Sequence, residues 1–101
     1  MQVEFRTPRL ERCYREHRRA VKAWGADIAE RYIERINILK SARGVEDLYR
    51  IEALRFHELK GRRAGEYAIW LGRRERLIVT FRGEAMTVVR IEEVTVNHYG
   101  D

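Results

Sequence analysis

Hydrophobic residues recur with two different periods along this chain, and the change of period divides it into a helical part and a strand part. Residues 2–6 alternate polar and apolar side chains, which predicts a short strand. Thr7 and Pro8 form a helix start, with Thr as the cap and Pro at the first helical position. Apolar residues at helical spacing continue to Gly25, which is expected to end this first helix. They are Leu10, Cys13, Tyr14, His17, Val21 and Trp24.

A second helix is predicted from about Ala26 to Gly44, because its apolar residues fall on one stripe. The stripe consists of Ile28, Tyr32, Ile36 and Leu39. Charged residues of this helix, Arg31 and Arg35 among them, are expected on its outer face, where ion pairs are weak. A short helical turn over residues 45–51 should lead the chain back towards a sheet.

From Leu54 onward the hydrophobic period changes to two, which is the period of a strand. Strands are predicted over residues 54–59, 67–71, 76–82 and 85–94, separated by turns at 61–65, 72–75 and 83–84. The short connections predict antiparallel pairing, and we expect a three-stranded antiparallel meander in one sheet. An N-terminal strand, two helices and a meander predict a single α+β domain over residues 1–101, with the helices on one face of the sheet.

The chain is basic, with a net charge of +5 and 18 arginines among its 21 basic residues. This balance favours an anionic partner, nucleic acid first, although a solvated surface would have the same composition. No apolar run is long enough to span a bilayer, and the N-terminal residues lack the core of a signal peptide. We therefore predict a cytoplasmic protein that contacts no membrane. The lone cysteine, Cys13, fits a reducing compartment and is expected to be a small core side chain.

The sequence carries no motif for a metal, a cofactor or a nucleophilic hydroxyl. It has no CxxC, no HExxH and no glycine-rich phosphate loop. Ser41 is the only serine and falls in a predicted helix, which argues against a catalytic triad built on serine. We therefore expect neither a metal nor a cofactor.

Two histidines, His57 and His98, lie in or beside the predicted sheet. Histidine titrates near neutral pH, so the pair could serve as base and acid, and two half-exposed histidines without a role are an equal alternative. Alternation along the strands places His57 and Arg76 on the open face of the sheet, provided that the strand register brings them together.

Residues 55–76 combine seven basic residues with three acidic ones and also include Tyr67 and Trp70. This mixture suits RNA, because cations meet phosphates and aromatic rings stack on bases. The alternative is structural: the rings pack in the sheet and the arginines occupy its turns.

Residues 55–69, which read RFHELKGRRAGEYAI, resemble the HigB branch of the RelE/ParE toxin superfamily. Members of that branch have a similar HxLKGxRxGxW pattern, followed by an arginine in the next strand, which here is Arg76. The order of the predicted elements also matches, so the resemblance covers nearly the whole chain. It implies a RelE-like fold and the toxin of a type II toxin–antitoxin system.

The resemblance further implies a ribosome-dependent endoribonuclease, an mRNA interferase that cleaves translated mRNA without a metal. In that reaction the 2′-hydroxyl attacks the neighbouring phosphate, and the protein supplies acid–base groups and cations. By position, the implied catalytic residues are His57, Lys60, Arg76 and His98. The implied RNA-binding residues are Arg55, Arg62, Arg63, Arg73, Arg74 and Tyr99. The C-terminus departs from the family's DYH block, because Asn97 replaces the acid and the histidine and tyrosine are exchanged.

The family also implies particular partners: a cognate helix-turn-helix antitoxin, operator DNA bound by the toxin–antitoxin complex, and the ribosome with its mRNA. Two alternative functions stay open. A ParE-like poison of DNA gyrase would share the fold but would not need His57 or Lys60, and the HxLKG block disfavours it. A catalytically inactive RNA-binding module would fit the altered C-terminus.

Overall fold

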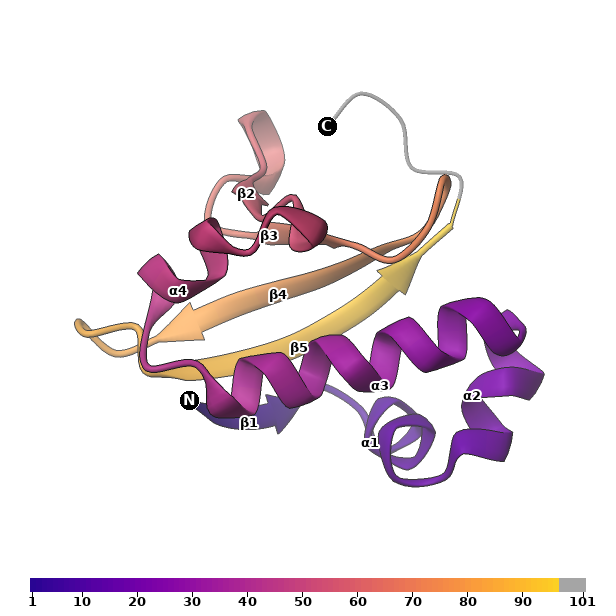
Figure 1. The fold of residues 1–101 in the computed structure, drawn as a ribbon. Coiled ribbons are helices and arrows are strands. Elements are labelled where there is room, and N and C mark those ends of the chain that lie inside the picture. The colour runs from indigo at the N-terminus through magenta and orange to yellow at the C-terminus, as the bar shows by residue number, and fades with distance from the viewer. Residues whose placement is uncertain (97–101) are drawn as a thin grey trace.

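A five-stranded mixed sheet lies at the centre of the computed structural model, which describes residues 1–96 (Figure 1). The elements in chain order are β1 (Gln2–Phe5), α1 (Pro8–Arg15), α2 (His17–Trp24), α3 (Ala26–Ser41), α4 (Val45–Arg50), the 3-10 turn η1 (Glu52–Leu54), β2 (His57–Glu58), the 3-10 turn η2 (Gly61–Arg63), β3 (Tyr67–Trp70), β4 (Arg76–Arg82) and β5 (Val88–Thr95). The α+β class and the order of helices before the meander are therefore as predicted.

The sheet has the strand order β1-β5-β4-β3-β2. Strands β3, β4 and β5 form the predicted antiparallel meander. The sheet is larger than the predicted three-stranded meander, because β2 adds an antiparallel edge strand and β1 adds a parallel one. Val3 pairs with Val89 in this parallel ladder, and the Arg6 amide extends it by donating to the Ile91 carbonyl at 2.9 Å. Short turns predict pairing only between strands that follow one another in the sequence. Because β1 and β5 are joined by the rest of the chain, turns could not predict this pairing.

The single helix predicted up to Trp24 is wrong, because the chain breaks at Glu16. Glu16 has extended backbone angles, φ −123° and ψ 97°, and separates α1 from α2. On either side of the break, α1 buries Leu10 and Cys13, and α2 buries Ala20. His17, which the continuous stripe placed on the apolar side, is exposed at the start of α2.

The strand predicted over residues 54–59 is reduced to two paired residues, His57 and Glu58. Leu54 instead closes η1 and is fully buried, and Arg55 follows in the left-handed region at φ 46°. Leu54 packs in the main core, and the backbone enters the ladder only at His57.

The last turn is also longer than predicted. It occupies residues 83–86, with left-handed φ values of 82° at Gly83 and 52° at Met86, so β5 begins at Val88 instead of Ala85. The other boundaries differ from the predictions by a few residues at most, and β4 matches its predicted bounds. None of the helices within residues 1–96 combines the length and apolarity needed to cross a membrane.

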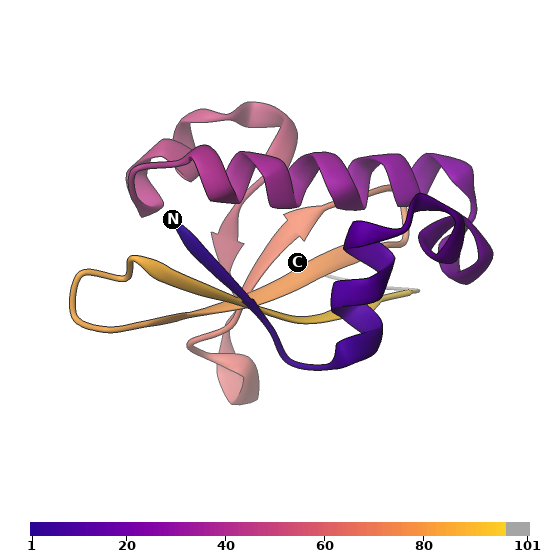
Figure 2. The ribbon, with the colours of Figure 1, turned by 90° about the horizontal axis from the view of Figure 1, so that it is seen from below.

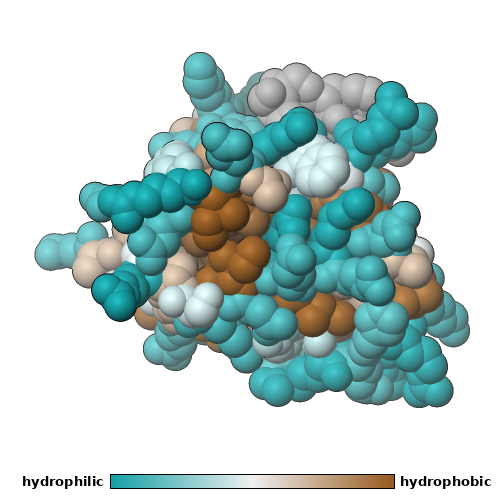
Figure 3. All heavy atoms as spheres, viewed as in Figure 1, coloured by the Kyte–Doolittle hydropathy of each residue, from teal (hydrophilic) through white to brown (hydrophobic). Residues whose placement is uncertain are grey.

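The main core lies between the helices and one face of the sheet, and Figure 2 shows α3 running across that side while η2 lies on the other. Leu77 and Val79 of β4 face this core, and Cys13 is buried in it, as predicted. Hydrophilic side chains cover most of the surface seen in Figure 3, with a smaller apolar area left visible. Among residues 1–96, the opposite face of the sheet carries a small separate cluster, made of Leu59, Ala68 and Ile78.

Candidate functional site

The structure places His57 and Arg76 on the same face of the sheet, as predicted. His57 pairs with Ala68 of β3, which pairs with Ile78 of β4, and Arg76 lies two residues before Ile78. Side chains two residues apart share a face, and here it is the face away from the helices. Strand spacing and rise put the two Cα atoms about 12 Å apart. Both groups are largely covered in this structure, because Arg76 is buried and the Nε2 atom of His57 is buried as well.

The His57 ring is oriented by the backbone just before it. Its Nδ1 atom lies 2.7 Å from the carbonyl oxygen of Arg55, which can only accept a hydrogen bond. The proton of a neutral ring therefore resides on Nδ1, which leaves Nε2 as the basic nitrogen. The left-handed conformation of Arg55 sits immediately before this contact, at a position where a non-glycine residue stores backbone strain.

Arg76 is a buried cation, with 8% of its surface exposed. Its Nη1 atom donates to the carbonyl of Gly72 at 2.7 Å and to that of Glu75 at 2.9 Å. These bonds close the turn between β3 and β4 onto the first residue of β4. Gly72 itself is tightly enclosed, because an added Cβ would lie 2.7 Å from Cδ1 of Ile28 and 2.8 Å from Oε1 of Glu75.

Two arginines of α3 reach the same end of β3, which corrects the prediction that they lie on the outer face of the helix. Arg31 donates to the Leu71 carbonyl at 3.1 Å. Arg35, only 6% exposed, donates to the Trp70 carbonyl at 3.2 Å and to the Ala53 carbonyl at 3.4 Å. Arg35 follows the buried residue Tyr32 by three positions, so helical spacing already placed it on the apolar stripe.

Trp70 lies between two cations from different parts of the chain. The guanidinium carbons of Arg55 and Arg31 lie 5.2 Å and 5.4 Å from the centre of its ring, within cation–π range. Tyr67 is also engaged, since it stacks on Phe56 and meets Phe81 edge-on, each with centroids 5.1 Å apart. Burial raises the pKa of the Tyr67 phenol. These contacts agree better with the structural alternative, in which the two rings pack within the protein, than with stacking on RNA bases.

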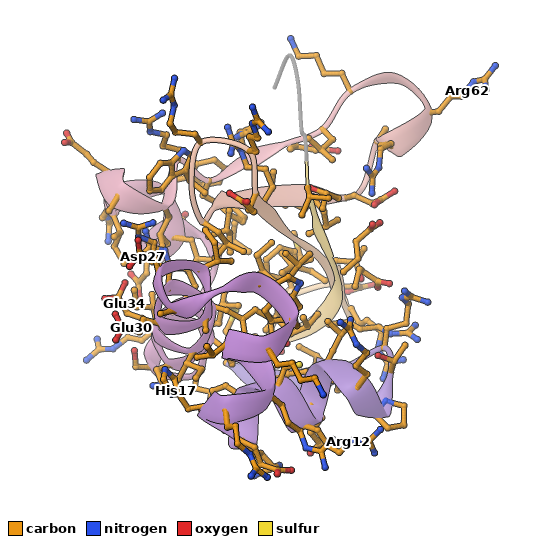
Figure 4. The ribbon with its side chains drawn as sticks, turned by 90° about the vertical axis from the view of Figure 1, so that its right-hand side faces the viewer. Arg12, His17, Asp27, Glu30, Glu34 and Arg62 are labelled. Carbon is orange, nitrogen blue, oxygen red and sulfur yellow. The ribbon has the colours of Figure 1, made fainter. Side chains whose placement is uncertain are left out.

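The loop from Leu59 to Glu66 carries three of the predicted cations. Lys60 and Arg62 are exposed, and Arg62 points away from the body of the molecule in Figure 4. Arg63 is held by two carboxylates, with Nη2 at 2.7 Å from Glu66 and 2.9 Å from Glu93, and the hydrogen bond to Glu66 is the main cause of its raised pKa. Arg63 therefore secures the loop to β5.

The other two predicted cations, Arg73 and Arg74, are exposed on the turn at the opposite end of β3. A strand of four residues separates the two basic turns, a length of about 13 Å. Beside this turn is an open cavity of about 650 Å³ that reaches the start of α3 and is also lined by Arg31 and Trp24. The predicted cations thus flank the His57–Arg76 face from two ends.

The remaining predicted site residues, His98 and Tyr99, lie outside the described residues, as does Asn97. Within residues 1–96, no three side chains of histidine, cysteine, aspartate or glutamate come together as a metal site.

No family model matches the chain, and no curated protein sequence matches it either. Solved structures do match the fold. The YoeB/ParE toxin from Agrobacterium tumefaciens is 18% identical, with a TM-score of 0.58 over 98% of this chain and 100% of that one.

Two further structures extend the comparison. The YoeB–YefM complex from Staphylococcus aureus contains a chain 18% identical to this one, with a TM-score of 0.54 over 98% of both. YafQ from E. coli strain BL21(DE3) is 9% identical, with a TM-score of 0.59 over 94% of this chain and 91% of that one. The chain therefore shares the fold of these three structures. At such identities the likeness defines the fold, and it does not single out the HigB branch.

Proposed function

We propose that this protein is the toxin of a type II toxin–antitoxin system and that it cleaves translated mRNA on the ribosome. The observation that carries the proposal is that His57 and Arg76 lie on the same sheet face, away from the helices, in a fold shared with the YoeB and YafQ structures. The HxLKG block at residues 57–61 supports the HigB branch specifically.

His57 is the proposed proton-transfer group of a metal-independent reaction. In its neutral form, Nε2 accepts the proton of an RNA 2′-hydroxyl while the 2′-oxygen forms a bond to the adjacent phosphorus. The bond from phosphorus to the 5′-oxygen then breaks, and that oxygen takes a proton from an acid. The products are a 2′,3′-cyclic phosphate and a 5′-hydroxyl. His57 in its protonated form is the alternative acid, and His98 is the predicted partner for the second proton transfer.

Cations around this face supply the charge that the reaction needs. Arg76 and Lys60 are proposed to stabilise the extra negative charge of the phosphorane, and the fork of an arginine suits a phosphate well. The RNA backbone is proposed to run between the two basic turns, past Arg62 at one end and Arg73 and Arg74 at the other. Arg55, Arg63 and Tyr99 complete the proposed RNA contacts.

The proposed partners follow from the same fold. One related structure is a YoeB–YefM toxin–antitoxin complex. We propose that a helix-turn-helix antitoxin likewise binds this protein and blocks its activity, and that the complex binds operator DNA. The proposed site of action is the cytoplasm, where mRNA is translated.

The test is to express the protein in bacterial cells without an antitoxin and to map new mRNA ends. We expect cuts within translated regions that carry 5′-hydroxyls, and we expect His57→Ala to reduce them by two to three orders of magnitude, about 10²–10³-fold. His17→Ala is the matched control, because His17 is an exposed histidine at the other end of the molecule (Figure 4).

Each outcome separates the proposed function from its alternatives. Equal cleavage by the parent and His57→Ala would contradict the role of His57. Growth arrest without new mRNA ends would indicate a gyrase poison, and the absence of any arrest would indicate an inactive RNA-binding module.

A further inference from the structure

Most of the net charge of this protein lies far from the proposed catalytic face. The arm formed by α1 and α2, residues 8–24, contains six basic and two acidic residues, a net +4 of the chain's +5. Figure 4 shows Arg12 of this arm at the opposite end of the molecule from Arg62. The molecule is up to 35 Å long, so one stretch of RNA strand in the active face does not explain the charge of the arm.

The basic residues of the arm converge on a groove of about 520 Å³ between α1 and α2. Arg9 and Arg12 line it from α1, and Arg19 and Lys22 line it from α2, with no acidic residue in the lining. Arg19 pairs with Glu16 at 3.1 Å on an exposed surface, a weak interaction. The other three cations form no ion pair with any residue between 1 and 96.

The residues that line the groove indicate which class of anionic partner fits it best. Its only apolar lining residues are Cys13 and Ala23, so it lacks the apolar centre of a protein–protein interface. The aromatic residues of the arm are already in contact with other side chains: Trp24 packs on Tyr32 and lies under Arg9, and Lys40 covers the ring of Tyr14. Single-stranded RNA is bound largely by stacking on aromatic side chains, whereas double-stranded RNA is bound through its backbone and shape.

We propose that the α1–α2 arm binds the phosphate backbone of double-stranded RNA, at a site separate from the strand that is cut. Guanidinium forks on both walls of the groove match phosphate oxygens, which carry the charge that this surface needs. The inference rests on the proposed function only for the source of the RNA, since a protein that acts on the ribosome meets folded RNA there.

The experiment measures binding of the full chain to a short RNA duplex by fluorescence anisotropy over a range of salt concentrations. The duplex carries 2′-O-methyl groups, which remove the nucleophile of the proposed reaction. The test variant combines Arg12→Gln with Lys22→Gln. The control combines Arg43→Gln with Arg50→Gln, two exposed arginines outside the arm, so that both variants lose the same charge.

We expect the arm variant to bind about tenfold more weakly at low salt, and the slope of log affinity against log salt to fall by about 1.5, as two lost phosphate contacts require. The control should stay within about twofold of the parent, because its arginines lie outside the groove. Arg12→Lys keeps the charge but loses the fork, so it should weaken binding less than Arg12→Gln does.

Three outcomes would overturn the proposal: equal losses in both double variants, unchanged binding by the arm variant, or tighter binding of an acidic polypeptide than of the duplex. Circular dichroism of each variant checks its fold. Because the duplex cannot be cut, this result is independent of whether the protein is a nuclease. A parent that binds the duplex through the arm but cuts no mRNA would refute the proposed function alone.

Discussion

Arginines near the sheet and arginines in the α1–α2 arm occupy different structural roles. Arg35 and Arg76 are less than 9% exposed. Arg35 donates to backbone carbonyls of two separate segments, and Arg76 donates to carbonyls of the turn that precedes it. Arg12 and Arg18 of the arm are exposed and form no ion pair with any residue of the described chain. Arginine is thus a buried structural residue near the sheet and an exposed, accessible charge in the arm.

This difference matters for the interpretation of mutations. Replacing Arg76 would remove a proposed catalytic charge and would also release the turn that carries Arg73 and Arg74. A loss of activity in such a variant combines folding with chemistry. Replacing His57 or the exposed Lys60 leaves these framework contacts in place, so those variants report on chemistry more directly.

The largest effect that we predict comes from a framework arginine. Arg35→Ala should lower the free energy of unfolding by about 3 kcal/mol, because it leaves the carbonyls of Trp70 and Ala53 without this donor and removes a buried stem. Arg18→Ala, the control in the arm, should change it by less than about 0.5 kcal/mol. Urea denaturation measures both, and similar losses would contradict the division between the two regions.

A second prediction tests how closely the turn between β3 and β4 sits on α3. Gly72→Ala should cost about 2 kcal/mol, because its methyl group would collide with Ile28 and Glu75. Gly44→Ala is the matched control, since nothing lies within 4 Å of a Cβ there and its φ of −175° suits any residue. If thermal unfolding shows equal losses of stability for the two variants, the close contact at Gly72 does not contribute to the free energy of unfolding.

The smallest predicted effect concerns how the arm is attached. Tyr32 donates to the Leu10 carbonyl at 2.7 Å beneath the arm, and burial raises the pKa of its phenol above the usual 10.0. Burial likewise raises the pKa of the Cys13 thiol above 9.0. The unfolded chain therefore loses these protons first, so the unfolded state binds fewer protons and stability falls as pH rises above about 9.

The expected slope approaches about 1.4 kcal/mol per pH unit for each group above its unfolded pKa. Urea denaturation at a series of alkaline pH values measures it. Tyr32→Phe should reduce the slope, whatever it does to the stability near neutral pH. An unchanged slope in that variant would mean that the attachment of the arm does not depend on a neutral phenol.

Local patterns predicted some elements well. They failed where an element or a strand pairing depends on contacts between residues that are far apart in the sequence. The bounds of β4 were predicted correctly because residues 76–82 are apolar or β-branched between two terminal arginines and lie between two turns that contain glycine. The break at Glu16 was missed, because an apolar stripe continues across it when His17 is counted as buried. The parallel pairing of β1 with β5 has no local signal, since it depends on where the helices carry the chain.

Some features of the candidate site could likewise be predicted from local sequence patterns, and others could not. Alternation within strands placed His57 and Arg76 on one face, because side-chain direction follows from sequence once the register is matched. The buried position of Arg35 could have been predicted from its spacing to Tyr32, but charge argued for an outer position. The left-handed turn at Arg55, which orients the His57 ring, carries no sequence signal for an arginine.

The position of β5 between β1 and β4 has a consequence for synthesis. Ribosomes add about 5–20 residues per second, so β1 emerges several seconds before the strand that it must pair with. Until residue 95 has been made, two strand edges remain open and the sheet is incomplete. Contacts that are so distant in sequence also form slowly. Each new copy therefore passes through a period in which chaperones and proteases can act on it before it is folded.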